Sequence, residues 1–145
     1  MSSIRRLSRA FALSLGLACA MPALAQDVPH VAPQNLSSYW IRLNTEVGVD
    51  MPNSGENLFK PVCVAVSYLI GSDGVPMDLK VRKVVPNSAL SSAALSAVSH
   101  FRYGPSLSNR TEQPIATYYV VPFNAPDDPA KRQQLMDACK LPGYQ

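Results

Sequence analysis

Histidine is scarce in this sequence: its 145 residues include two, His30 and His100, and no G-x-S-x-G motif occurs. Serine hydrolases of the common type pair a nucleophile with a histidine base, and no serine, histidine and acid stand here in such an order. His100 lies at the end of an expected helix, where a structural role is the simpler interpretation. The sequence therefore predicts no catalytic residues and no enzyme.

The sequence also lacks an excess of charge of one sign when its first residues are left out of the count. Lys and Arg number 13 and Asp and Glu 10, but Arg5, Arg6 and Arg9 precede a long uncharged run over residues 10–26. Without that region, 13 − 3 = 10 basic residues face 10 acidic ones. A chain without net positive charge has no field to hold nucleic-acid phosphates or anionic lipid headgroups. No nucleic-acid partner is expected.

The first 25 residues have the parts of a secretory signal peptide in the usual order. The three arginines are followed by an apolar core over residues 11–21, by Pro22, and by an A-x-A sequence that predicts cleavage between Ala25 and Gln26. The uncharged run has 17 residues, whereas a membrane-spanning helix needs about 20 apolar ones. We therefore expect secretion and no membrane anchor after cleavage. An uncleaved anchor is the alternative, and a lipoprotein signal at Cys19 is a weaker one.

Cysteine is rare as well, and loss of the leader would leave Cys63 and Cys139. An even number of cysteines in an exported chain favours a disulfide between them. There is no C-x-x-C redox motif, and no cluster of histidines or carboxylates accompanies the two cysteines, so a zinc site is not indicated. We expect no metal and no cofactor. Two unpaired buried thiols are the alternative to the disulfide.

Alternating apolar residues over 62–70 predict a strand. A turn with Asp-Gly chemistry follows at Gly74, and residues 77–85 predict the returning strand of an antiparallel hairpin. Residues 89–101 carry one apolar helical stripe after the capping Ser88, and the Gly and Pro of residues 102–105 end that helix.

The second half of the chain predicts a third strand over residues 115–123. Proline removes a ladder donor, so Pro114 and Pro122 place this strand at the sheet edge. Asp127, Asp128 and Pro129 are typical of a helix start and predict a C-terminal helix over 130–139. In the otherwise irregular region before residue 62, residues 36–43 predict a short helix.

This order predicts an α+β fold: a small antiparallel three-stranded sheet, in the order β-β-α-β, with a helix packed on one face. The Cys63–Cys139 disulfide would tether the C-terminal helix so that Leu135 and Met136 lie on the other face. The expected divisions are a signal peptide (1–25), an irregular N-terminal segment (26–61), the α+β domain (62–124) and a C-terminal helical extension (125–145).

Several motifs of this chain follow one another as in a known family. They are Val64-x-Val66-x-Tyr68-x-Ile70 with Asp73-Gly74, Leu79-x-Val81, Leu90-x-x-Ala93-Ala94-Leu95-x-Ala97-Val98, Phe101-Arg102-Tyr103-x-Pro105, and the run from Pro114 to Phe123. Together they resemble the C-terminal domain of TonB, the energy-transducer family of the bacterial periplasm. Ser91 and Phe101 stand where the family usually has Asp and Trp. The resemblance implies a periplasmic location and a link to TonB-dependent transport across the outer membrane.

An exposed sheet edge offers unpaired N–H and C=O groups to an extended peptide. The resemblance implies the same use, since the last strand of such domains receives a short segment of an outer-membrane receptor. The expected peptide-binding residues are those of the last strand: Ile115, Thr117, Tyr118, Tyr119 and Val121. A Tyr119→Pro substitution is expected to abolish partner capture without loss of the fold.

Three alternatives to this hypothesis stay open. The protein could be a structural or assembly subunit, such as a homodimer, with its edge strand permanently paired. It could be an anchored energy transducer if the leader is not cleaved. The aromatic side chains of Tyr118 and Tyr119 could also pack under the N-terminal segment or against the C-terminal helix rather than contact a partner.

Overall fold

The computed structural model describes residues 27–145. The expected signal peptide and its cleavage point between Ala25 and Gln26 lie outside the described residues. The elements follow in the order η1 (Pro33–Ser38, a 3-10 helix), β1 (Trp40–Arg42), β2 (Val62–Ile70), β3 (Pro76–Val85), α1 (Ser91–Ser99), β4 (Tyr103–Pro105), β5 (Ile115–Phe123) and α2 (Pro129–Ala138).

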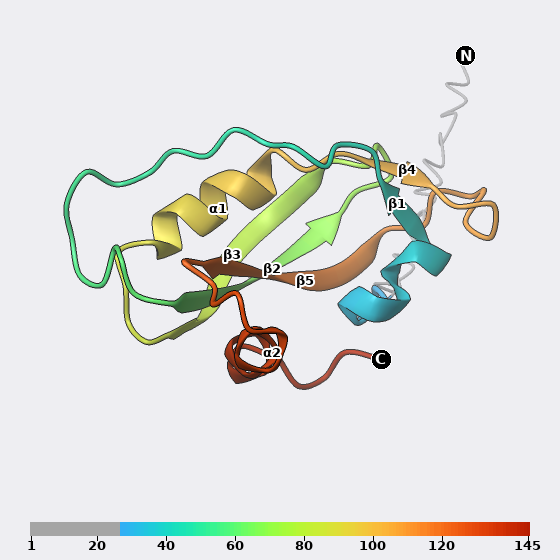
Figure 1. Ribbon diagram of the computed structural model, residues 1–145. Coiled ribbons are helices and arrows are strands. Elements are labelled where there is room, and N and C mark those ends of the chain that lie inside the picture. The colour runs from blue at the N-terminus through green and yellow to red at the C-terminus, as the bar shows by residue number, and fades with distance from the viewer. Residues whose placement is uncertain (1–26) are drawn as a thin grey trace, which may run out of the picture.

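A three-stranded antiparallel sheet in the order β3-β2-β5 forms the centre of the fold. α1 lies on one face of this sheet and α2 lies on the other (Figure 1). The central strand β2 is therefore covered on both sides, and eight of its nine residues are buried. The predicted α+β fold, with one helix on the sheet and a second helix tethered behind it, is confirmed.

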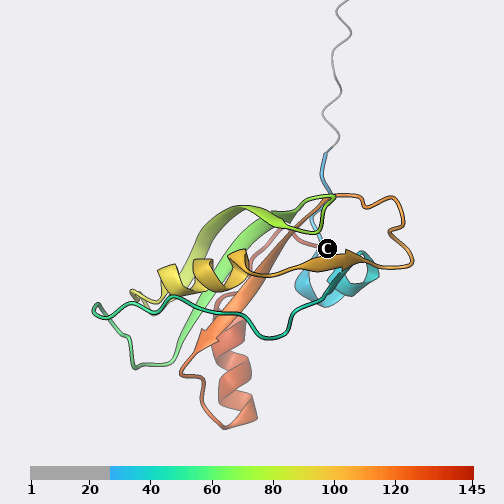
Figure 2. The same cartoon turned by 90° about the horizontal axis from the view of Figure 1, so that it is seen from above.

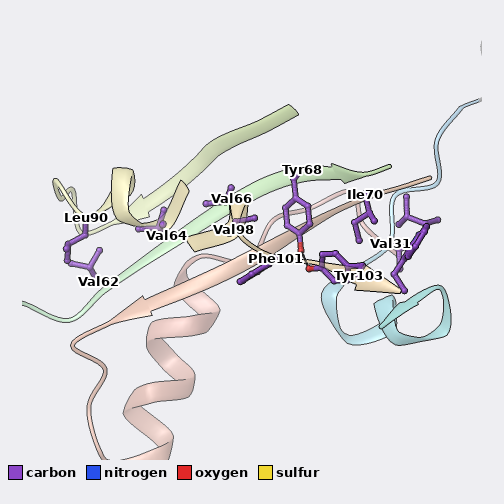
Figure 3. Packing of buried hydrophobic residues seen from close by; sticks show 13 residues of the cluster. Val31, Val62, Val64, Val66, Tyr68, Ile70, Leu90, Val98, Phe101 and Tyr103 are labelled. Carbon is purple, nitrogen blue, oxygen red and sulfur yellow. Dashed lines mark hydrogen bonds between the residues drawn. The ribbon is translucent and has the colours of Figure 1, made fainter. Parts of the chain in front are cut away.

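The core on the α1 face is apolar and close-packed. β2 contributes Val62, Val64, Val66 and Ile70 to this core, and α1 contributes Ala94 and Val98. Val98 lies near Val66, whereas Ile70 lies at the other end of the strand, near Val31 (Figure 3). Small residues let the helix approach the sheet closely. Tyr68 is also buried there, and its hydroxyl lies 2.6 Å from that of Tyr103.

The opposite face carries a smaller core beneath α2. It consists of Cys63, Ala65, Tyr118, Val120 and Cys139, with Leu135 and Met136 packed against it. The disulfide joins Cys63 to Cys139 with Cα atoms 6.0 Å apart, as predicted. α2 begins at the expected cap, because the Asp128 carboxylate accepts a hydrogen bond of 2.9 Å from the Lys131 amide.

One prediction for the N-terminal region is wrong. Residues 36–43 do not form one helix: the 3-10 helix η1 ends at Ser38, and Trp40–Arg42 is the strand β1, which pairs antiparallel with β4. Trp40 is buried, and its indole N–H donates to the carbonyl oxygen of Gln113 at 3.0 Å. β4 consists of Tyr103–Pro105, which the sequence predicted only as the end of the helix over 89–101. Long-range pairing and burial of Trp40 outweigh local helix propensity here.

The segment that joins β1 to β2 passes over α1 (Figures 1 and 2). It is held by hydrogen bonds between Asn44 and the His100 carbonyl, and between Asp50 and Ser96. His100 thus has a structural place at the end of α1. α1 is two residues shorter than expected at each end, whereas α2 has the expected length and begins and ends one residue earlier.

Candidate functional site: the β5 edge

The two edges of the main sheet differ in what they offer a partner. On β3, the pairing with β2 is interrupted by register shifts, and charged side chains are exposed at Asp78, Lys80, Arg82 and Lys83. Bulges and charges are features that protect sheet edges from further pairing. β5 pairs with β2 in regular register along all nine residues. Its outer edge is the one suited to strand addition.

The chain itself covers the beginning of that edge. Residues 29–31 run parallel to β5, with His30 opposite Ala116. The Val31 amide donates to the Ala116 carbonyl (2.8 Å), and the Ala116 amide donates to the Pro29 carbonyl (2.9 Å). The Thr117 hydroxyl also donates to the Val31 carbonyl (2.7 Å). At Pro33 the chain enters the 3-10 helix η1 and leaves the edge of β5.

Beyond Ala116 the outward backbone groups of β5 have no hydrogen-bond partner in the described part of the chain. N–H and C=O groups of an edge strand point alternately toward the neighbouring strand and away from it. Since both groups of Ala116 point outward, those of Tyr118 and Val120 and the carbonyl of Pro122 do so too. Within residues 27–145, no backbone hydrogen bond reaches these groups from outside the sheet. Pro122 occupies an outward position, where its missing N–H removes no bond from the ladder.

The five residues expected to contact a peptide are placed differently from one another. Ile115 and Thr117 are fully buried, and Tyr118 is 6% exposed. The Tyr118 ring packs against Tyr144 with centroids 4.8 Å apart. Tyr119 and Val121 are half-buried. The edge therefore offers a partner mostly backbone, together with parts of these last two side chains.

A groove flanks the open edge on each side of the sheet. On the α1 side, a hollow of about 250 Å³ is lined by Leu36, Trp40, Ile41, Arg42 and Tyr119, among others. On the α2 side, a hollow of about 190 Å³ is lined by Val120, Gln133, Met136 and Lys140, among others. The sequence did not predict these grooves, because much of their lining comes from η1, β1 and α2 rather than from β5.

Arg42 is the cation of the α1-side groove. Its guanidinium carbon lies 4.6 Å from the centroid of the Phe101 ring and 5.4 Å from that of Tyr119. Cation–π contacts of this kind hold a guanidinium in place. In the described part of the chain, no carboxylate lies within ion-pair distance of Arg42. The salt bridge found in residues 27–145 joins Lys140 to Asp137 instead.

The hydroxyl pair of Tyr68 and Tyr103 lies in the core near Arg42. Burial raises the pKa of Tyr68 well above its ordinary value of 10.0, and the neighbouring Tyr103 raises it further. Burial also raises the pKa of Tyr103, against the opposing effects of its hydrogen bond to Tyr68 and of the Arg42 charge. Both hydroxyls are therefore neutral at physiological pH and satisfy one another.

Neither a metal centre nor a membrane span is found in residues 27–145. No group of three or more His, Cys, Asp or Glu side chains in this range could hold a metal ion. No helix in the same range is both long enough and apolar enough to cross a bilayer. His30, at the covered end of the β5 edge, packs against Tyr144 with ring centroids 5.3 Å apart and the rings tilted by 34°.

The β-β-α-β order, the helix on one face and the open edge at β5 define a small α+β module with a sheet edge suited to strand addition. Residues 62–124 match the family model described as "Gram-negative bacterial TonB protein C-terminal", so the chain contains a TonB C-terminal-like domain. The match runs from β2 to just past β5 and leaves out η1, β1 and α2. No curated protein matches this chain.

Proposed function

We propose that this protein is a periplasmic binding module that docks an extended segment of a protein partner on β5 by strand addition. The segment pairs with the outward backbone groups between Tyr118 and Pro122. The observation that carries the proposal is the regular and unpaired outer edge of β5 beyond Ala116. Backbone pairing supplies affinity in such complexes, and the flanking grooves supply selectivity.

The TonB C-terminal-like domain supports a partner in the outer membrane. Domains of this family generally interact with outer-membrane receptors, so the proposed partner is an exposed segment of such a receptor. The module acts without a catalytic step and without a cofactor. Secretion through the expected leader, cleaved between Ala25 and Gln26, would deliver it to the periplasm.

Nuclear magnetic resonance on the ¹⁵N-labelled secreted chain tests the docking edge. The probe is a synthetic peptide with the sequence Thr-Val-Thr-Val-Thr, blocked at both ends. A matched control has alternate amides N-methylated, so that it cannot pair. The unmodified peptide should shift or broaden the amide signals of Tyr118 and Val120, whereas the methylated peptide should not. Failure of the unmodified peptide to perturb β5 would overturn the proposal.

The same sample distinguishes docking from a permanently paired edge. In a monomer with an open edge, the amides of Tyr118 and Val120 exchange rapidly with solvent, because nothing outside the sheet accepts their protons. In a homodimer paired through β5, those amides are protected and the mass in solution is doubled. Protection together with a doubled mass would replace the docking function with an assembly role.

A further inference from the structure

A hollow lies beside β3 on the face of the sheet that carries α2. α2 and Cys139 pack over Cys63 and Ala65 of β2, and the next residue of that strand on the same face is Ser67. The hollow begins there and has a volume of about 190 Å³. The side chains that line this β3-side hollow include those of His30, Ser67, Asp78, Lys80, Arg82 and Tyr144.

Ser67 supplies a buried hydroxyl to the hollow. The residue is 8% exposed, and its hydroxyl forms no hydrogen bond with any group of residues 27–145. In the same range, every side-chain polar atom that is fully sealed from solvent has a partner, so the Ser67 oxygen is accessible from the hollow. Buried polar groups are almost always hydrogen-bonded. The partner of this hydroxyl therefore comes from what occupies the hollow.

Three charged side chains follow one another along β3 at the hollow. Lys80 pairs with Ser67 in the β2–β3 register, so the two side chains are neighbours across the ladder. Asp78 and Arg82 stand two residues to either side of Lys80, at the two register shifts of this pairing. Such irregularities re-aim side chains and are frequent beside active sites. The order of the charges along the strand is negative, positive, positive.

These opposite charges are not paired with one another. The salt bridge found in residues 27–145 lies at the end of α2, and none joins Asp78 to Lys80 or to Arg82. Each of the three charges is therefore available to a ligand. Two cations and one carboxylate complement a ligand that carries a doubly charged anion and a single ammonium. A phosphate monoester has a charge of about −1.5 to −2 at pH 7 and three acceptor oxygens, whereas a carboxylate has one charge and two oxygens.

We propose that the β3-side hollow binds a phosphoethanolamine group, that is, a phosphate with an ammonium two carbons away. Ser67, Lys80 and Arg82 donate to the phosphate oxygens, and the Asp78 carboxylate accepts from the ammonium. The volume of the hollow is below the range of roughly 300–1,000 Å³ that is typical of pockets for drug-sized ligands, so it suits a group of this small size. This site is distinct from the outer edge of β5 and does not depend on docking there.

Nuclear magnetic resonance titrations of the ¹⁵N-labelled protein with three small compounds test the inference. O-phosphoethanolamine carries both charged groups, ethyl phosphate lacks the ammonium, and β-alanine has a carboxylate in place of the phosphate. O-phosphoethanolamine at millimolar concentration should shift the amide signals of Ser67 and Lys80. Ethyl phosphate should bind about tenfold more weakly, as expected for the loss of one charge-assisted hydrogen bond. β-Alanine should also bind more weakly than O-phosphoethanolamine.

Protein variants assign each charge to its partner. Asp78→Asn should bring the affinities of O-phosphoethanolamine and ethyl phosphate to within about twofold, because the acceptor for the ammonium is lost. Residue 78 has a φ of +52°, which asparagine tolerates, so the fold is kept. Arg82→Gln should weaken both compounds about tenfold. Lys83→Gln makes the same change of charge at an exposed residue of β3 outside the hollow and should leave both affinities unchanged.

Lipid vesicles distinguish the two sources of such a group. Phosphatidylethanolamine presents it as a headgroup, whereas phosphatidylcholine has methyl groups in place of the ammonium protons and cannot donate to Asp78. Sedimentation with equimolar vesicles of the two lipids, but not with phosphatidylcholine alone, would support a lipid headgroup as the ligand. Binding of free O-phosphoethanolamine without sedimentation would support a soluble ligand.

Two results would overturn the inference. If O-phosphoethanolamine leaves the amide signals of Ser67 and Lys80 unchanged, the charges of β3 protect the sheet edge and bind no ligand. If the compound binds but its affinity is the same in Asp78→Asn and Arg82→Gln, the hollow is not where it binds. Neither result bears on docking at β5, which is tested with extended peptides.

Discussion

Cys63, on the central strand of the sheet, is joined by a disulfide to Cys139, just after α2, across a sequence separation of 76 residues. α2 has no buried residue of its own, and its contacts with the sheet are made by half-buried side chains such as Leu135 and Met136. The helix is therefore held on the sheet chiefly by this bond.

Replacing both cysteines with alanine should detach α2. In the chain-entropy description, a loop of this length contributes about 4 kcal/mol to the free energy of unfolding. We expect the double variant to lose about that amount in denaturant titrations and to lose hydrogen-exchange protection over α2. The strands β2, β3 and β5 should keep theirs, because the α1-side core is untouched.

Lys140→Gln is the matched control for the disulfide variant. It removes an exposed ion pair with Asp137 at the same end of α2, and exposed pairs contribute little to stability. Protection of α2 should be unchanged in this control. If α2 stays protected in the cysteine double variant, its apolar contacts suffice and the tethering role of the disulfide is wrong.

A second prediction concerns Gly74, in the turn between β2 and β3. Its φ is +75°, and a Cβ there would lie 2.0 Å from the carbonyl oxygen of Tyr103. Gly74→Ala therefore combines backbone strain of about 1–2 kcal/mol with a clash against the backbone. It should lower the free energy of unfolding by more than strain alone.

Gly143→Ala separates the two effects. Gly143 also has a positive φ, +85°, but no atom lies within 4 Å of its Cβ position. This variant should lose no more than the strain energy. Equal losses for the two variants in denaturant titrations would mean that the contact between the turn and β4 does not constrain residue 74.

The main sheet could be predicted from the sequence because its signals are local. Alternation over β2, the Asp-Gly turn and the helical stripe of α1 each extend over fewer than 15 residues of sequence. The disulfide was also predictable, since the expected loss of the leader would leave two cysteines. β1 and β4 were not, because each has three residues, too few to show a period, and they form only by pairing with each other.

The site was predictable in part for a related reason. Pro122 indicated that β5 is an edge, and the structure places β5 there. Coverage of Ala116 by residues 29–31, and burial of Tyr118 against Tyr144, depend on segments far away in sequence. Arg42 was missed because residues 36–43 were expected to be helical, which would have placed its side chain elsewhere.

The buried hydroxyl pair predicts how stability depends on alkaline pH. The pKa values of Tyr68 and Tyr103 are raised in the folded state, chiefly by burial. Above pH 10 the unfolded chain loses protons that the folded protein retains, so the free energy of unfolding falls as the pH rises. Replacing both tyrosines with phenylalanine should remove this contribution and make that slope shallower.

Single and double variants check that the two hydroxyls act together. Tyr68→Phe leaves the Tyr103 hydroxyl without its partner in the core and should cost about 1–3 kcal/mol. The double variant should lose less than the sum of the two single losses, because it leaves no unpaired hydroxyl. Additive losses, or an alkaline slope unchanged in the double variant, would show that the hydroxyls are not coupled.

A proline at position 120, rather than at position 119, tests the docking edge. Tyr119 lies at a position whose N–H points toward β2, so Tyr119→Pro would break the ladder and remove a ring that packs on Phe101. Val120 points its N–H outward instead. Val120→Pro should remove a donor available to a partner while leaving the β2–β5 pairing intact.

Val120→Ala is the control, because both substitutions remove apolar contacts beneath α2 and only proline removes the N–H. The two variants should keep the same strand pairing in nuclear magnetic resonance spectra. The alanine variant should still bind an extended peptide, whereas the proline variant should bind at least about fivefold more weakly, as expected for loss of roughly 1 kcal/mol from one backbone hydrogen bond. Equal binding by the two variants would show that the partner does not pair with β5 at this position, and the register of docking would have to be sought elsewhere on the edge.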